Sequence, residues 1–95
     1  MAGRIEGSVV AISPEGDLVT SIASDQLRSA PRDHSVMISC GEHETVGIFP
    51  PDHQEAPMTF LAILKEGGPL NLVIVGDSAK MMLGITVGEQ VTVKW

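Results

Sequence analysis

Residues 5–22, near the amino end, read IEGSVVAISPEGDLVTSI and carry the clearest fold signal in the chain. Apolar and polar residues alternate on both sides of Ser13-Pro14-Glu15-Gly16, as they do in half-buried strands. Pro at the second position and Gly at the fourth position are typical of a tight turn. We therefore predict a β-hairpin with strands over residues 5–12 and 17–22.

The rest of the chain continues this pattern of short apolar runs separated by turn residues. Val and Ile outnumber the aromatic residues, which are two Phe and one Trp, and branched side chains favour strands. Further strands are predicted over residues 35–40, 44–49, 58–64, 70–75 and 90–95, with 72–75 central and the most buried. Asp77 or Ser78 as N-cap and Gly84 as the last residue predict a short helix near residues 78–83.

These elements predict one domain over residues 1–95 with a mainly β fold. The expected architecture is a small antiparallel β-barrel of about seven strands, because small sheets close to protect their edges. A helical turn over residues 24–28 is expected to follow the hairpin, with Ser24 as a possible N-cap. Residues 50–57 are polar and bounded by proline, which predicts an exposed connection.

Charge and composition exclude some functions. The formal net charge is −6 and the sequence pI about 4.8, which disfavours nucleic acid as a partner. No apolar run reaches the length of a signal peptide or a membrane span, so no membrane association and a cytoplasmic location are expected. Cys40 is the only cysteine and lies in an apolar run, which predicts a buried thiol.

The residue types that carry catalysis and metal binding form no recognisable motif in this sequence. His34, His43 and His53 form no tight ligand spacing, so no metal site is predicted. The chain pairs no nucleophile with a base, which makes a stand-alone enzyme the least favoured class and leaves no predicted catalytic residue. The helix start at 77–79 could offer unpaired backbone N–H groups to a ligand, whereas the simpler alternative is that Asp77 only caps the helix.

Two segments carry a resemblance to a known family. Residues 7–22 are similar to a segment with glycine, a strand, Asp-x-Phe-Gly-Asn and Leu-Val-Thr-Asn-Ile. Residues 70–79, followed by Leu83-Gly84, Gly88 and Val91, are similar to Leu-Glu-Ile-Ala-Val-Asn-Gly-Gly-Ser-Ala and a closing Leu-Gly, Gly and Val. Both patterns resemble the carboxy-terminal β-barrel domain of the S-adenosylmethionine hydroxide adenosyltransferase and halogenase family, and the match spans nearly the whole chain.

The resemblance implies a barrel that packs against a larger catalytic domain, usually in a trimer, with the adenine of S-adenosylmethionine at the interface. No cofactor is certain, but S-adenosylmethionine or adenosine is the ligand that the resemblance implies. The resemblance implies that the family's adenine-binding turn and loop correspond to six residues of this chain, namely Gly16, Asp17, Gly76, Asp77, Ser78 and Ala79. The chain departs from the family pattern at Glu15, Asp17 and Val75, where the family has Phe, Asn and often Asn.

The function expected from these observations is a stand-alone, non-catalytic barrel module that self-associates or docks on a partner chain. A homo-oligomer is expected, and the resemblance favours a trimer. The first alternative is a subunit that contributes half of an adenosine site to a separate catalytic chain. The second is a small anion-binding barrel, because residues 78–93 also resemble the ends of molybdate-binding barrels and of small barrel domains of ferrous iron transport.

Two apolar features bear on assembly. Met81 and Met82 lie in the predicted short helix, and an exposed methionine there would favour contact with another chain. Alternation over the last strand places Val91, Val93 and Trp95 on one face, which predicts that Trp95 caps the barrel.

Overall fold

The computed structural model describes residues 3–28, 30–33, 35–50, 52, 54–65 and 67–95. Within these residues eight strands form one sheet in the order β4-β3-β8-β1-β2-β7-β6-β5. The strands are β1 (Arg4–Ile12), β2 (Leu18–Ala23), β3 (Met37–Cys40), β4 (His43–Val46), β5 (Ile48–Phe49), β6 (Phe60–Leu64), β7 (Pro69–Ile74) and β8 (Gln90–Lys94). A 3-10 helix, η1 (Ser24–Leu27), and an α-helix, α1 (Ala79–Leu83), complete the fold.

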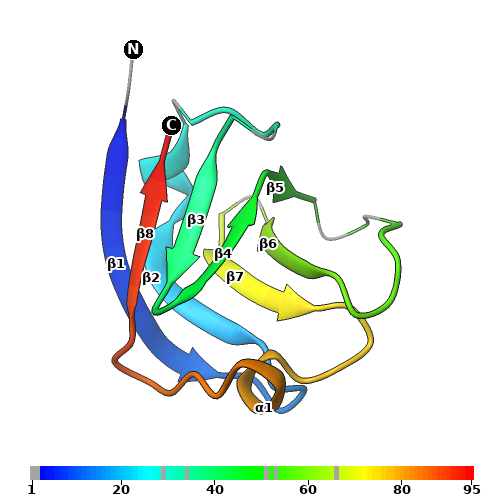
Figure 1. Cartoon of the computed structure of the whole chain (residues 1–95). Helices are drawn as coiled ribbons and strands as arrows, with labels where there is room; N and C mark the ends of the chain where they lie inside the picture. Colours follow the sequence, from blue (N-terminus) through cyan, green and yellow to red (C-terminus); the bar gives the residue numbers. More distant parts are fainter. Residues whose placement is uncertain (1–2, 29, 34, 51, 53, 66) are drawn as a thin grey trace.

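The sheet curls into a nearly closed barrel (Figure 1). β4, at one end of the strand order, lies next to β6 near the other end. The Thr45 Oγ1 on β4 donates a hydrogen bond to the Phe60 carbonyl oxygen on β6 at 2.8 Å. The predicted mainly β barrel is thus confirmed, with eight strands in place of about seven. No helix in the described part of the chain is long and apolar enough to cross a membrane.

The predicted hairpin forms where the turn residues placed it. The Gly16 N–H donates to the Ser13 carbonyl at 2.9 Å, and the Ser13 N–H donates to the Asp17 carbonyl at 3.0 Å. β1 pairs with β2 near the turn and with β8 along its first half, from Arg4 opposite Lys94 to Ser8 opposite Gln90. The long first strand therefore belongs to both halves of the barrel.

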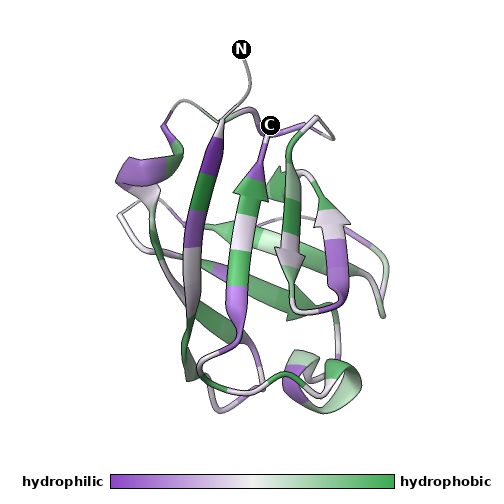
Figure 2. Ribbon diagram, turned by 60° about the vertical axis from the view of Figure 1, so that its left-hand side comes forward, coloured by the Kyte–Doolittle hydropathy of each residue, from purple (hydrophilic) through white to green (hydrophobic). Residues whose placement is uncertain are grey.

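The core lies inside the barrel and follows the alternation of the strands. Figure 2 shows apolar and polar residues alternating along β1 and β8. β7 carries more buried residues than any other described strand (Leu70, Leu72, Val73 and Ile74), as its unbroken apolar run predicts. Trp95 is partly buried against the core, which confirms its predicted place on the face of Val91 and Val93.

The strands β2, β7 and β6 also carry apolar residues on the outside of the barrel. Leu61 and Val73 are cross-strand partners that are buried but stand apart from the core cluster. Ile63 pairs with Asn71, which in turn pairs with Val19. Because side chains alternate along a strand, these five residues share the outward side of the sheet; we call them the outer face.

The strand predicted over residues 44–49 is wrong, because the chain breaks at Gly47. Gly47 has a φ of 84°, a conformation that does not continue an extended strand. Its N–H donates to the Val36 carbonyl at 2.9 Å. The chain then turns into β5, which pairs with β6 in parallel, whereas the other strand pairs of the described sheet are antiparallel.

The helical turn after β2 forms as η1, but Ser24 is not its N-cap. The N-cap is Ala23, whose N–H donates to the Gln26 Oε1 at 2.9 Å. The Ser24 hydroxyl oxygen instead accepts the Gly67 N–H at 3.2 Å, which ties η1 to the β6–β7 turn. A bond to a distant segment thus replaces the predicted local cap.

α1 forms as predicted, with Ser78 as its N-cap. The Ser78 Oγ accepts the Met81 N–H at 3.2 Å, and Gly84 ends the helix in the left-handed conformation with a φ of 68°. The Asp77 carboxylate accepts the Ser78 N–H at 2.7 Å and does not cap the helix. The alternative in which Asp77 is the cap is therefore wrong.

Cys40 lies at the end of β3 and is fully buried, as its apolar surroundings predict. Burial raises the pKa of its thiol to about 11, and the negative charge of Glu89 adds to this effect. A buried thiol with a raised pKa is a poor nucleophile at neutral pH, because the thiolate is the reactive form.

Candidate functional site

The β1–β2 turn and the loop after β7 meet at one end of the barrel, beside α1 (Figure 1). The Lys80 N–H donates to the Gly16 carbonyl at 3.0 Å. Gly16 lies so close to Ser78 that a Cβ on Gly16 would be 1.9 Å from the Ser78 Oγ. The two segments that the family resemblance singles out are therefore neighbours in the fold, although they are far apart in the sequence.

A cavity of about 540 Å³ opens beside these two segments. We call it the turn–loop cavity. Its size is within the range of small-molecule pockets in proteins. It is lined by residues of the turn, of β6 and β7 and of the loop before α1: Glu15, Asp17, Ile63, Val73, Ile74, Val75, Gly76, Asp77 and Ser78.

Four of the six predicted contact residues line the turn–loop cavity, namely Asp17, Gly76, Asp77 and Ser78. Gly16 is buried beneath Ser78 and Ala79 is fully buried in the core, and neither lines the cavity. Gly16 and Ala79 position the two segments. Ligand binding by the other four residues stays a prediction.

The apolar part of the cavity is formed by Ile63, Val73, Ile74 and Val75, and the first three were not predicted from the sequence. The apolar pattern of the sequence is sufficient to assign Ile63, Val73 and Ile74 to strands. Which residues of these strands lie next to the β1–β2 turn depends on the register between β2, β7 and β6, and the pattern does not predict that register. Glu15 and Val75, two of the positions that depart from the family pattern, line the cavity as well.

Carboxylates dominate the polar lining of the turn–loop cavity. Glu15, Asp17 and Asp77 contribute three carboxylates, and no Lys or Arg is among the described lining residues. Desolvation by burial raises the pKa of Asp17, and the charge of Glu15 raises it further. Because ionised carboxylates only accept hydrogen bonds, the cavity suits a neutral or cationic ligand rich in N–H or O–H donors.

The raised pKa of Asp17 predicts a pH dependence of stability. The folded protein binds the proton of Asp17 more tightly than the unfolded chain does. The protonated Asp17 therefore contributes fully to stability below its ordinary pKa of 3.8, and this contribution is lost as pH rises through the raised pKa of the folded state. Asp17→Asn should therefore become steadily more stable, relative to the original protein, between about pH 3 and about pH 7. Urea unfolding across this range measures the difference.

A control variant separates the two causes of the raised Asp17 pKa, which are burial and the charge of Glu15. Glu15→Gln removes only the smaller, charge-based cause, so it should change stability in the same direction as Asp17→Asn but by less. A difference between Asp17→Asn and the original protein that does not vary with pH would contradict the raised pKa.

A metal site receives no support from the described residues, in which no group of three His, Cys, Asp or Glu side chains could hold an ion. The His43 Nε2 lies 3.1 Å from the Leu83 carbonyl oxygen, which connects β4 to the end of α1. His34 and His53 lie outside the described residues.

Comparison with known proteins places the fold. No family profile and no curated protein match the chain. Among solved structures, an uncharacterized conserved protein from Thermotoga maritima is similar, with a TM-score of 0.75 and 17% sequence identity over 95% of this chain. The chain spans 35% of the length of that protein. At this identity the likeness shows that both proteins contain the same barrel fold.

Proposed function

We propose that this chain is a non-catalytic β-barrel module that docks on another polypeptide, either a second copy or a separate catalytic chain. The observation that carries the proposal is the apolar rim of the turn–loop cavity. Met58, Met81 and Met82 are 53%, 82% and 50% exposed. Exposed, flexible methionines are typical of surfaces that contact a partner.

Backbone hydrogen bonds tie Met58 and Met81 to residues that line the cavity. The Met58 N–H donates to the Val75 carbonyl at 2.7 Å, and the Met81 N–H donates to the Ser78 Oγ at 3.2 Å. Val75 and Ser78 both line the cavity. A chain that covered the methionines would therefore also close the turn–loop cavity.

The outer face continues this surface, because Ile63 and Val73 belong both to it and to the cavity. It contains Asn71, whose Oδ1 is buried without a hydrogen-bond partner among the described residues. Such a buried, unpaired oxygen is rare in folded proteins. Because this oxygen is already shielded from solvent within one chain, a docked chain would reach it only after a local rearrangement of the outer face.

A second candidate function is half of an adenosine site, completed by the partner chain. It is favoured by the meeting of the 15–17 turn with the 76–78 loop, the two segments that the resemblance assigns to adenine. The amino group of adenine and the ribose hydroxyls are donors that match the carboxylate lining. The same carboxylates disfavour a small anion as the ligand of this cavity.

The docking proposal predicts a concentration-dependent assembly that Met81→Glu weakens. Light scattering on the original protein should show a mass above that of one chain, or a stable complex with the catalytic chain. Met81→Glu should raise the dissociation constant at least about tenfold, as expected for a residue at an interface. Val46→Glu is the matched control, because Val46 is 48% exposed, lies on β4 and does not line the turn–loop cavity.

Two results would overturn the docking proposal. One is a monomer at every concentration that also binds no catalytic chain, and the other is an equal effect of Met81→Glu and Val46→Glu. Adding adenosine to the same samples tests the second candidate. NMR shifts of the Gly76 and Ser78 amides that appear only in the assembled form would support it, and unchanged spectra in both forms would exclude it.

A further inference from the structure

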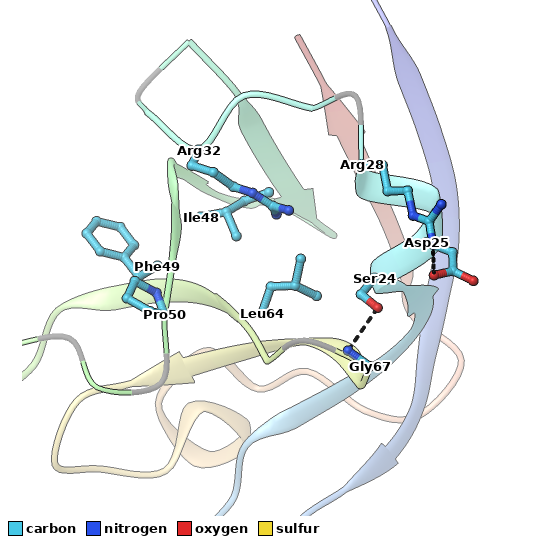
Figure 3. A pocket seen from close by; sticks show the side chains of 9 residues that line it. All are labelled: Ser24, Asp25, Arg28, Arg32, Ile48, Phe49, Pro50, Leu64 and Gly67. Atoms are coloured by element: carbon cyan, nitrogen blue, oxygen red, sulfur yellow. Dashed lines mark hydrogen bonds and ion pairs between the residues drawn. The ribbon is translucent and has the colours of Figure 1, made fainter.

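A second cavity, also of about 540 Å³, lies between η1 and the β5–β6 side of the barrel (Figure 3). We call it the arginine cavity. One wall comes from η1 and the loop after it, with Asp25, Arg28 and Arg32, and the other comes from the sheet, with Ile48 and Leu64. Its lining shares no residue with the turn–loop cavity.

The cavity combines an apolar floor with a cationic side. Ile48 is buried and Leu64 packs against the core, and Phe49 and Pro50 continue the apolar lining. In Figure 3 the Arg32 side chain extends past Ile48 toward the space above Leu64. A guanidinium group therefore stands over apolar surface.

Hydrogen bonds link the two walls of the cavity. The Ile48 N–H donates to the Arg32 carbonyl at 3.0 Å, so the residue that forms the floor also anchors the arginine. On the other side, the Gly67 N–H donates to the Ser24 Oγ, and the Ser24 N–H donates to the Gly68 carbonyl, both at 3.2 Å. A cavity with fixed walls loses less conformational entropy when a ligand binds.

The charges of the two cavities are opposite. Arg28 and Arg32 are two of only six Lys and Arg residues in a chain with net charge −6, and both line this cavity together with a single acid, Asp25. Asp25 pairs with Arg28 at 3.4 Å, but both side chains are about 80% exposed, and such pairs contribute little. The Arg32 guanidinium makes no hydrogen bond or ion pair with any described residue.

We propose that the arginine cavity binds a small organic anion, a carboxylate or a phosphate attached to an apolar body. The guanidinium groups of Arg32 and Arg28 bind the anion, because their N–H groups match the oxygens of both acids in pairs. The apolar body packs on Ile48 and Leu64. A polyanion is disfavoured, because the rest of the acidic surface repels it.

NMR titration of the whole chain tests the proposal with three probes that share one body: 1-naphthoate, 1-naphthyl phosphate and 1-naphthylmethylammonium. The two anions should shift the amides of Ile48, Leu64 and Gly67, and the cation should not. Comparison of the two anions shows which acid the cavity prefers. The result does not depend on the docking proposal, because the probes bind a different cavity.

Two variants with the same change of charge separate a specific site from general attraction. Arg32→Gln should raise the dissociation constant of the preferred anion about tenfold, the usual effect of losing a charge-assisted hydrogen bond. Lys94→Gln, on the far strand β8, should change it by less than about twofold. Both residues are exposed, so the spectra of both variants should remain those of the folded protein.

Several outcomes would overturn the proposal: equal binding of the ammonium probe, equal effects of Arg32→Gln and Lys94→Gln, or shifts confined to the turn–loop cavity. The absence of any shift at millimolar concentrations of both anions would overturn it as well.

Discussion

Replacing Gly16 by alanine is expected to lower the free energy of unfolding by about 3 kcal/mol. Gly16 has a φ of 89°, in the region that residues with a side chain rarely adopt. An added Cβ would lie 1.9 Å from the Ser78 Oγ and 2.6 Å from the Ser78 Cβ, so either the turn or the start of α1 must move. Backbone strain contributes about 1–2 kcal/mol, and the steric overlap contributes the rest.

Gly67→Ala is the matched control for Gly16→Ala. Gly67 has a similar φ of 80°, but nothing lies within 4 Å of an added Cβ. This variant should lose only the cost of backbone strain, about 1 kcal/mol. Urea unfolding followed by circular dichroism measures both variants. Equal losses of stability would show that the β1–β2 turn and the 76–78 loop are not in close contact. The two segments could then not form the turn–loop cavity together.

Leu72→Ala is expected to lower the free energy of unfolding by about 3–4 kcal/mol. Leu72 is fully buried on β7 and stands between Leu18 on β2 and Ala62 on β6. Removing its side chain leaves a cavity between three paired strands, and paired backbones cannot easily move together to fill it. For a domain of this size the loss is a large part of the total stability.

The control for Leu72→Ala is Val46→Ala, which removes an apolar group that is already 48% exposed. Its effect should stay within about 0.5 kcal/mol. Thermal unfolding should show the same order. A loss of less than about 1 kcal/mol for Leu72→Ala would contradict its place at the centre of the core.

Features that depend on neighbouring residues could be predicted from the sequence. Pro14 and Gly16 indicate the first turn, and Ser78 and Gly84 mark the start and end of α1, because caps and turns are set by residues a few positions apart. Alternation likewise indicated which residues of β8 face the core. These patterns were sufficient for the barrel and for most of its strands.

Features that depend on distant partners could not be predicted. The break at Gly47 depends on its hydrogen bond to Val36, and the role of Ser24 depends on Gly67. The candidate site likewise has one part that could be predicted from the sequence and one part that could not. The resemblance supplied the 15–17 turn and the 76–78 loop, whereas the apolar lining around Val73 follows from strand register. The position of Arg32 over Ile48 follows from a long-range hydrogen bond.

The position of β8 has a consequence for the order in which the protein folds during synthesis. β8 pairs with both β1 and β3, so until residues 90–94 leave the ribosome these two strands each keep a row of unpaired backbone groups. The β1–β2 hairpin needs only early residues, whereas the β3–β8–β1 half needs contacts that span most of the sequence. A nascent chain therefore exposes two unpaired strand edges, which favour aggregation, until β8 has left the ribosome.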